Sequence, residues 1–244
     1  MSDRKVIVLL TATINPGATP FVVRNSPSIR MTEYKDALNS WILHGGASRI
    51  IVCENSGAEL AELKMSIPAN KSPNVEFVSY VDLKSGPTRG KGYAELGEIE
   101  RVLSCVNNIA LTDVVVKCTG RLIVRNGAEL LRRVAHIDFD VMCDLRKYLT
   151  YADTRIFAAT REFLENYLIQ RRETVNDNSG IYLEHALAAA VGTGLANGKK
   201  WRPFPLLPQI VGVSGTTGKS MTDPVLKGVA RRTYYRLIDR VYRR

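Results

Sequence analysis

Basic and hydroxyl side chains interrupt an otherwise apolar segment in the middle of the chain. Residues 114–124 read VVVKCTGRLIV, so Lys117, Thr119 and Arg121 stand at alternate positions of a predicted strand. Successive side chains point to opposite faces of a strand, and we therefore expect these three on one face. Burying Lys or Arg there is costly unless the charge is paired or faces a cleft. The pattern indicates either an internal ion pair or a cationic ledge that binds an anion, and we favour the ledge.

Two turns rich in glycine and basic residues are further candidates for binding phosphate. The first, SGPTRGKGYAE, places Lys91 at the start of a predicted helix, where free N–H groups and the helix dipole attract anions. The second, GVSGTTGKS at 212–220, ends like a Walker A loop but has Val213 where that motif needs glycine. We therefore exclude a Walker A site. Amides, hydroxyls and the Lys219 ammonium still suit a diphosphate, although a solvated turn is the alternative for both segments.

Three titratable residues are candidates for acid–base chemistry. Asp153 and Arg155 stand together in YADTRIF, where they either pair with one another or bind sugar hydroxyls. Glu184 and His185 lie within an apolar helical pattern, IYLEHALAAAV, which favours a role in a cleft over an ordinary surface position. We rank Glu184 first and Asp153 second as the general base. His185 is a third catalytic candidate because it is next to Glu184.

The bulk properties are those of a folded protein with an anionic partner. The chain has 244 residues, enough for one α/β domain, and a formal net charge of +10. That charge favours nucleic acid, a phosphorylated ligand or an acidic membrane face. The four cysteines form no CxxC pair, which indicates buried thiols in a reducing compartment and no zinc site. No apolar run is long enough to span a bilayer, so we expect a cytoplasmic protein.

Predicted strands and helices alternate along the sequence. The strands are expected at 5–13, 48–57, 74–82, 112–124, 139–146 and 154–160, and the helices at 31–46, 92–106, 161–172 and 181–191, the first capped by Thr32. This order predicts an α/β fold with a mainly parallel sheet. Ligands of such sheets gather at the carboxyl ends of the strands, where this chain has Thr11, Asn15, Glu54 and Asn55.

The last 22 residues form a separate basic segment. Residues 223–244, DPVLKGVARRTYYRLIDRVYRR, are expected to form a helix that follows a domain at 1–222. Its arginines and tyrosines suit an anionic membrane surface. A helix docked on the sheet with a solvated basic face explains the same pattern.

Five segments together resemble a known group of bacterial proteins. GKGYAE, VVVKCTGRLIV, ADTRIF, NDNSGIYLEHAL and GVSGTTGK are similar to segments of proteins encoded with capsule and O-antigen genes, which are regarded as glycosyltransferases with a GT-A-like fold. The resemblance runs from the first strand to the Gly-Lys loop. It implies transfer of a sugar from a nucleotide-diphosphate donor to a saccharide or polyprenyl-linked acceptor during synthesis of surface polysaccharide.

The resemblance also implies which residues bind the donor. Residues at the end of the first strand and Glu54–Asn55 would line the nucleotide pocket, Lys91 would lie near the nucleotide, and the C-terminal loop would close over the diphosphate. The donor-binding candidates are Thr11, Asn15, Glu54, Asn55, Lys91, Lys117, Thr119, Gly120, Arg121, Arg155, Ser214, Thr216, Thr217 and Lys219.

The chain departs from the pattern where related enzymes bind a metal. Those enzymes hold Mn or Mg through an Asp-x-Asp pair on the strand that here carries Lys117 and Arg121. Use of Mn or Mg is therefore open, and we name no metal-binding residue. Cationic side chains could instead stabilise the leaving diphosphate directly.

Two other functions fit parts of the sequence. A nucleotidyltransferase or phosphotransferase on a similar sheet would use the same basic loops but needs a pair of metal-binding carboxylates, which we cannot place. A basic nucleic-acid-binding module would explain the charge, but no helix-turn-helix, RRM or KH signature is present. We therefore expect no nucleic-acid partner.

Overall fold

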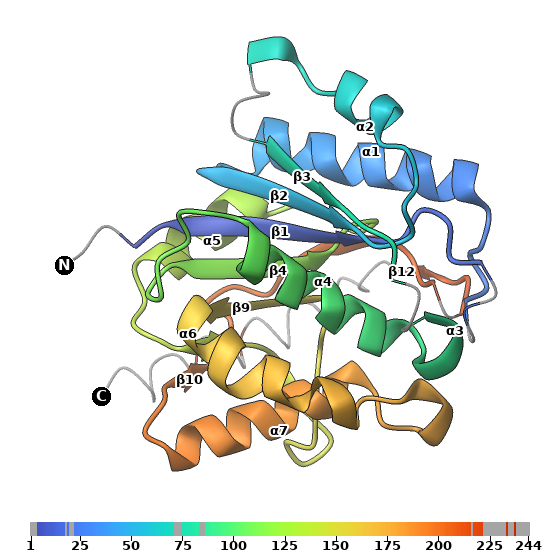
Figure 1. Cartoon of the computed structure of the whole chain (residues 1–244). Helices are drawn as coiled ribbons and strands as arrows, with labels where there is room; N and C mark the ends of the chain where they lie inside the picture. The colour runs from blue at the N-terminus through green and yellow to red at the C-terminus, as the bar shows by residue number, and fades with distance from the viewer. Residues whose placement is uncertain are drawn as a thin grey trace.

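A seven-stranded sheet forms the centre of the protein, in the order β10-β6-β9-β4-β1-β2-β3 (Figure 1). The computed structural model describes residues 4–17, 19, 22–70, 75–82, 86–215, 217–221, 233 and 237. The strands of this sheet are β1 (Val6–Ala12), β2 (Arg49–Glu54), β3 (Val75–Ser79), β4 (Val114–Thr119), β6 (Val141–Met142), β9 (Ile156–Thr160) and β10 (Trp201–Arg202). Strands β1 to β4 pair in parallel, while β9 is antiparallel to both of its neighbours. The expected α/β class with a mainly parallel sheet is confirmed.

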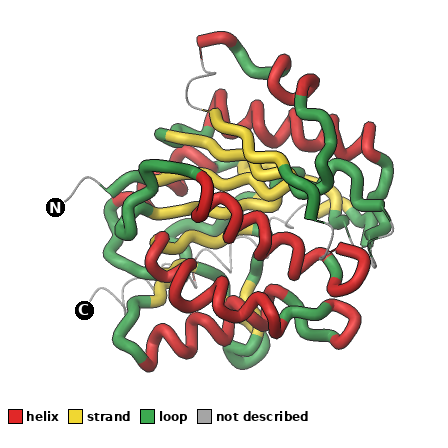
Figure 2. Tube along the Cα trace, viewed as in Figure 1, coloured by secondary structure: helices red, strands yellow, loops and turns green. Residues whose placement is uncertain are grey.

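Helices cover both faces of the sheet (Figure 2). Helices α1 (Pro27–His44) and α5 (Gly127–Ala135) pack on one face, and α4 (Lys91–Cys105) and α7 (Leu183–Ala196) on the other. Strand β1 serves both layers, because Val8 and Leu10 join the first core cluster while Ile7 and Leu9 join the second. This burial on both sides explains why its sequence is a continuous apolar run rather than an alternating one. Two short helices, α2 (Ala61–Met65) and α3 (Gly86–Arg89), complete this part of the chain.

Several element boundaries differ from the sequence prediction. Helix α1 begins at Pro27 after Ser26, five residues before the predicted cap Thr32, because proline at the first helical positions loses no backbone hydrogen bond. The predicted helix at 161–172 is divided into α6 (Arg161–Phe163), a π-helical turn η2 (Leu164–Leu168) and a 3-10 helix η3 (Ile169–Thr174). The segment 139–146 contains two short strands, β6 and β7 (Leu145–Arg146), and β7 pairs with β8 (Tyr151–Ala152).

The segment 112–124 also divides into two strands. Strand β4 ends at Thr119, and after a turn at Gly120 the chain forms β5 (Ile123–Val124), which belongs to a second sheet with β11 (Ile210–Val213) and β12 (Ser220–Met221). A side chain at Gly120 would place Cβ 2.6 Å from the carbonyl oxygen of Thr11, so only glycine fits this close approach. The Gly-Lys loop connects the antiparallel pair β11–β12, which is not the strand-to-helix turn of a P-loop.

The strand order creates a switch point between β1 and β4. From β1 the chain passes through α1 to β2 and β3 on one side, and it returns through α4 to β4 on the other side of β1. The chain therefore reverses its direction across the sheet next to β1, and open α/β sheets hold their ligands at the carboxyl ends of the strands at such a point. No helix in the described part of the chain is long and apolar enough to cross a membrane. The tail at 223–244 lies outside the described residues except for 233 and 237, so the basic helix and the boundary at 222 stay predictions.

Candidate functional site

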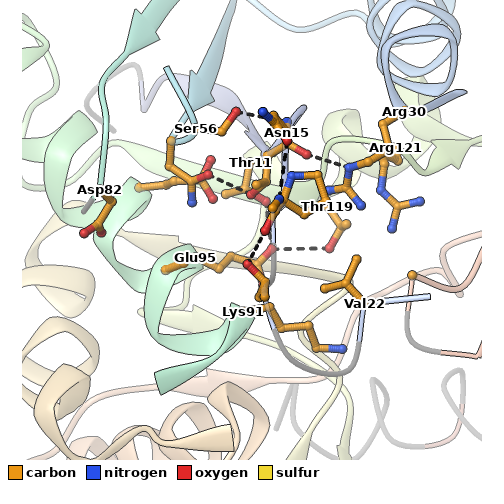
Figure 3. A pocket seen from close by; sticks show the side chains of 18 of the residues that line it. Thr11, Asn15, Val22, Arg30, Ser56, Asp82, Lys91, Glu95, Thr119 and Arg121 are labelled. Atoms are coloured by element: carbon orange, nitrogen blue, oxygen red, sulfur yellow. Dashed lines mark hydrogen bonds between the residues drawn. The ribbon is translucent and has the colours of Figure 1, made fainter. Parts of the chain in front are cut away.

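A pocket of about 280 Å³ opens at this switch point (Figure 3). Its lining comes from the end of β1 and the loop after it, the first turns of α1, the loop after β2, the first half of α4 and the end of β4. Of the candidates predicted from the sequence, the pocket brings together Thr11, Asn15, Asn55, Lys91, Thr119 and Arg121. The others lie behind the wall, in neighbouring loops or outside the described residues.

Arg30 contributes a buried positive charge to one wall of the pocket. Its side chain, in α1, is 6% exposed. Nε donates to the carbonyl oxygen of Thr13 at 2.6 Å, Nη1 to that of Arg24 at 2.9 Å and Nη2 to the Tyr34 hydroxyl at 3.1 Å. All of these acceptors are neutral, and no described carboxylate forms an ion pair with Arg30. Its charge therefore remains available to an anion in the pocket.

Two further arginines share a single carboxylate beside it. Glu33 lies 2.8 Å from a terminal nitrogen of Arg24 and 2.9 Å from one of Arg121. Burial raises the pKa of the Tyr34 hydroxyl, and the charges of both Arg30 and Arg121 oppose that shift. We call Arg24, Arg30 and Arg121 the arginine cluster. With one carboxylate among three guanidinium groups, its net charge is positive and favours an anionic ligand.

Lys117 does not belong to this wall. Its side chain is fully buried, forms an ion pair with Glu95 and donates to the carbonyl oxygen of Thr154 at 2.7 Å and to the Thr119 hydroxyl at 3.3 Å. All three ammonium protons thus have partners within the protein. Of the two sequence interpretations, the structure gives the internal ion pair. Lys117 and Thr119 do share a face, but Arg121 turns to the α1 side because β4 has ended at Thr119.

Two carboxyl groups of α4 face the pocket, and their pKa values are shifted in opposite directions. Burial alone would raise the pKa of Glu95, but Lys117 and a 2.7 Å hydrogen bond from the Thr11 hydroxyl hold it below its usual range. Burial, assisted by the nearby Glu95 carboxylate, raises the pKa of Glu98 well above its usual range. Glu98 accepts a hydrogen bond from the backbone N–H of Ala12 at 2.7 Å. Three carboxyl groups therefore line the pocket: Glu95, which pairs with Lys117, Glu98, whose pKa is raised, and Asp82, which pairs with Arg172.

This donor set does not fit Mn or Mg. Among the residues that the structure describes, no group of three or more His, Cys, Asp or Glu is placed to hold a metal ion. Glu95 is already paired with Lys117 and Asp82 with Arg172, and burial raises the pKa of Glu98, which disfavours its ionised form. Divalent cations need several ionised or carbonyl oxygens at one point, which these three side chains do not supply.

The loops after β1 and β2 are joined by a buried glutamate. Glu54 is fully buried and accepts hydrogen bonds from the backbone N–H groups of Ile14 at 3.0 Å and Ala58 at 3.1 Å. It therefore supports the pocket from behind and does not line it. Asn55 does line the pocket and accepts a 2.7 Å hydrogen bond from the Thr13 hydroxyl. The prediction that Glu54 lines the pocket was wrong. Its carboxylate accepts hydrogen bonds from three backbone N–H groups and one hydroxyl, and these bonds stabilise the charge in a buried position.

The N-terminus of α4 is occupied by a side chain of the protein itself. Asp177, in the 3-10 turn η4 (Asp177–Ser179), accepts from the backbone N–H of Gly92 at 3.3 Å. A Cβ at Gly90 would lie 2.5 Å from Asp177, so glycine is required for this approach. The expectation that this helix end is open to phosphate is corrected, although Lys91 itself lines the pocket.

Among the described residues of the Gly-Lys loop, Gly215 is the one that reaches the pocket. Gly215 lines it, and its carbonyl oxygen accepts from the backbone N–H of Val23 at 3.0 Å. Ser214 and Lys219 close the hairpin through a 2.9 Å bond from the Ser214 N–H to the Lys219 carbonyl, and the Ser214 hydroxyl accepts from the Thr217 N–H at 3.2 Å. Thr216 lies outside the described residues. Closure of these side chains over a ligand stays a prediction.

The candidate acid–base residues form a separate group beside the pocket. Asp153 pairs with both Arg155 and Arg146; burial alone would raise its pKa, but these arginines hold it below the usual range. Glu184, at the start of α7, accepts from the Thr154 hydroxyl at 3.1 Å, and the Thr154 carbonyl in turn accepts from Lys117. A continuous series of polar contacts thus connects Glu184 with Glu95 on the pocket wall.

Among the pocket residues that sequence reasoning missed are two pairs on helices. Arg30 and Tyr34 are spaced i,i+4 in α1, and Glu95 and Glu98 are spaced i,i+3 in α4. The available signal was a charged residue on the apolar face of each helix, since such a residue must have a partner or a cleft.

Comparisons with known proteins agree with this architecture. No protein-family model and no curated protein matches the chain. Among solved structures, the galactosyltransferase LgtC in complex with donor and acceptor sugar analogs is similar, with a TM-score of 0.50, 13% identity and coverage of 82% of this chain and 74% of that chain. A protein of Desulfovibrio desulfuricans assigned as a nucleotide-diphospho-sugar transferase has a TM-score of 0.45 at 12% identity, covering 82% and 79%. A cytidylyltransferase from Leptospira borgpetersenii has 0.47 at 12% identity, covering 84% and 77%.

Identities this low show the fold alone. The fold is the GT-A-like α/β fold of nucleotide-diphospho-sugar transferases. Membership of the capsule and O-antigen group stays a prediction.

Proposed function

We propose that this protein is a glycosyltransferase that uses a nucleotide-diphospho-sugar donor. The observation that carries the proposal is the arginine cluster at the switch point of the sheet, in which Arg30 and Arg121 line the pocket and Arg24 lies beside them on the shared carboxylate of Glu33. Three guanidinium groups with one carboxylate among them complement the charge of a diphosphate. The likeness of the fold to LgtC supports the same class of substrate.

In this proposal the protein stabilises the leaving group with fixed cations. The bond between the anomeric carbon and a diphosphate oxygen breaks, and the nucleoside diphosphate leaves with the additional negative charge. Arg30 and Arg121 on one wall, with Lys91 at the start of α4, would hold that charge. Preorganised positive groups in a partly buried site stabilise developing charge without reorganising at the moment of reaction.

Glu184 is the proposed general base. An acceptor hydroxyl would form the new bond to the anomeric carbon and transfer its proton to the Glu184 carboxylate. Glu184 is preferred over Asp153 because two arginines neutralise Asp153, while Glu184 is held by the neutral hydroxyls of Thr154 and Tyr151. We further propose, from the resemblance alone, a saccharide or polyprenyl-linked acceptor in surface-polysaccharide synthesis, and contact of the tail with an anionic membrane.

A thermal-shift screen tests donor binding. UDP, GDP, CDP, dTDP and their sugar conjugates are each added with and without Mn, and a ligand at 100 times its Kd should stabilise the protein by about 2.7 kcal/mol. The Arg30→Met and Arg121→Met variants should lose most of the shift, each compared with its own ligand-free Tm. Arg132→Met, on the exposed surface of α5, is the matched control and should keep it.

The products distinguish this activity from its alternative. Release of a nucleoside diphosphate from the donor that binds is expected. If no nucleotide raises the Tm, or if the protein releases pyrophosphate from a nucleoside triphosphate and a sugar phosphate, the glycosyltransferase proposal is wrong.

A further inference from the structure

We infer that a saccharide, the acceptor of the proposed reaction, stacks on aromatic rings beside Glu184. The rings are those of Tyr151, Tyr182 and His185, which we call the aromatic platform, with Tyr148 on the adjoining hairpin tip. Only the identification of this saccharide as the acceptor rests on the proposed function. The platform itself is argued from its own geometry.

The three rings form one packed group. Tyr182 and His185 are stacked, with ring centroids 5.5 Å apart and planes 22° apart. Tyr151 meets His185 edge-on, at 5.2 Å and 86°. His185 Nδ1 accepts from the backbone N–H of Tyr182 at 3.1 Å, which fixes the imidazole and leaves Nε2 to carry the donor proton. The rings are therefore held in place before any ligand arrives, while Tyr182 remains exposed.

One ring of the platform contacts the proposed base. The Tyr151 hydroxyl is hydrogen-bonded to Glu184, and burial, reinforced by that carboxylate, raises the pKa of Tyr151 to about 12. Glu184 also accepts from Thr154, whose carbonyl binds Lys117 and so reaches Glu95 on the pocket wall. A sugar on these rings would therefore present its hydroxyls to Glu184, next to the pocket proposed for the donor.

A strained hairpin adjoins the platform. At the tip of β7–β8, Lys147, Tyr148 and Leu149 have φ of 48°, 56° and 67°. Non-glycine residues are strained in this left-handed region, because Cβ comes too close to the following carbonyl oxygen. The tip is held by the Lys147 ammonium, 4.2 Å from the centroid of the Tyr151 ring, and by a 2.6 Å bond from the Thr150 hydroxyl to the Lys147 carbonyl. Strain of this kind gathers at ligand sites, and here it holds Tyr148 fully exposed.

The chemistry of the group favours a saccharide over a lipid surface. The C–H faces of a pyranose pack on aromatic rings, while its hydroxyls need the polar partners that tyrosine hydroxyls, His185 Nε2 and Glu184 provide. An anionic bilayer would instead bring negative charge to Glu184 and desolvate it, which is unfavourable. One lysine at the tip is a small attraction in comparison.

The test is binding of the full chain, without nucleotide, to a microarray of defined oligosaccharides. The Tyr148→Ala/Tyr182→Ala double variant should lose at least ten-fold in binding, and Tyr182→Phe, which keeps the ring, should retain most of it. Met65→Ala, an exposed apolar side chain on α2, is the control and should bind as the wild type. Unfolding curves of all variants are recorded so that loss of binding is compared only between folded proteins.

Three results would overturn the inference. They are a wild-type protein that binds no oligosaccharide, a double variant that binds as well as the wild type, and vesicles of phosphatidylglycerol that bind the wild type but not Tyr148→Ala. Nucleotide thermal shifts separate this failure from that of the proposed function. Shifts without oligosaccharide binding refute the platform alone, whereas variant-sensitive oligosaccharide binding without any nucleotide shift refutes the glycosyltransferase and leaves the platform.

Discussion

Lys117 is a charge on the central sheet whose function is settled by its partners. The ammonium has Glu95, Thr119 and Thr154 around it, and Glu95 in turn holds the Thr11 hydroxyl at the end of β1. The ion pair therefore connects α4 to the ends of β1 and β4, the two strands that form the pocket. A buried pair of this kind fixes geometry, because either partner alone would be an uncompensated charge.

We predict that Lys117→Met destabilises the protein by about 3–5 kcal/mol, since the variant leaves Glu95 buried without its cation. The measurement is the free energy of unfolding in urea. The Lys117→Met/Glu95→Gln double variant should recover part of the loss, because it removes both charges. A single variant within 1 kcal/mol of the wild type, or a double variant that is worse than the single, would contradict the ion-pair interpretation.

At the scale of elements, the pocket depends on contacts between segments that are distant in sequence. The hairpin β11–β12 lies against the segment before α1 through the Gly215 carbonyl and Val23, and against Arg121 through the Val213 carbonyl at 3.4 Å. The arginine cluster and the Gly-Lys loop are therefore neighbours, although about 90 residues separate Arg121 from Gly215. A diphosphate on the cluster would lie near the hairpin.

We predict that Lys219→Ala raises the donor KM or lowers kcat about ten-fold, because it removes a cation from the loop beside the diphosphate. The assay is release of nucleoside diphosphate from the donor identified by thermal shift. Lys200→Ala provides the control, since Lys200 pairs with Asp138 away from the pocket. Unchanged kinetics in Lys219→Ala would remove the loop from the mechanism.

At the scale of the whole molecule, two buried carboxyl groups, Glu98 and Asp153, contribute to the pH dependence of stability with opposite signs. Burial raises the pKa of Glu98 in the folded protein, while the unfolded chain titrates near 4.5. The stability that the protonated group contributes is therefore fully present below pH 4.5 and declines as the pH rises toward the folded pKa. Asp153 has the opposite sign, because its folded pKa is lowered and its contribution is lost only in strong acid.

We predict that Glu98→Gln flattens the decline of stability above pH 4.5 and makes the protein more stable than the wild type at neutral pH. The amide oxygen can still accept from the Ala12 N–H, while no group at this position must lose a proton. Free energies of unfolding at several pH values from 5 to 9 test this. If the curves of the wild type and the variant are parallel, the pKa of Glu98 is not raised in the folded protein and the prediction is wrong.

Much of the fold could be predicted from local patterns. The apolar runs of β1, β2 and β4 and the helical spacing in α4 and α7 identify these elements, because burial of one or both faces is recorded directly in the sequence. The same is true of the polar residues at strand ends, among which Thr11, Asn55, Thr119 and Arg121 do line the pocket. Short strands such as β6 and β10 leave almost no pattern.

The partner of each charged residue was decided only by the tertiary structure. The sequence alone placed Lys117 in an apolar strand, which required a partner or a cleft, but the partner Glu95 comes from another element. Likewise Asp177 occupies the end of α4, and Arg121, just after β4, pairs with Glu33 of α1. Periodicity determines which side of its own element a residue occupies. Which charge faces which depends on the order of strands in the sheet, and that order follows from packing of the whole chain.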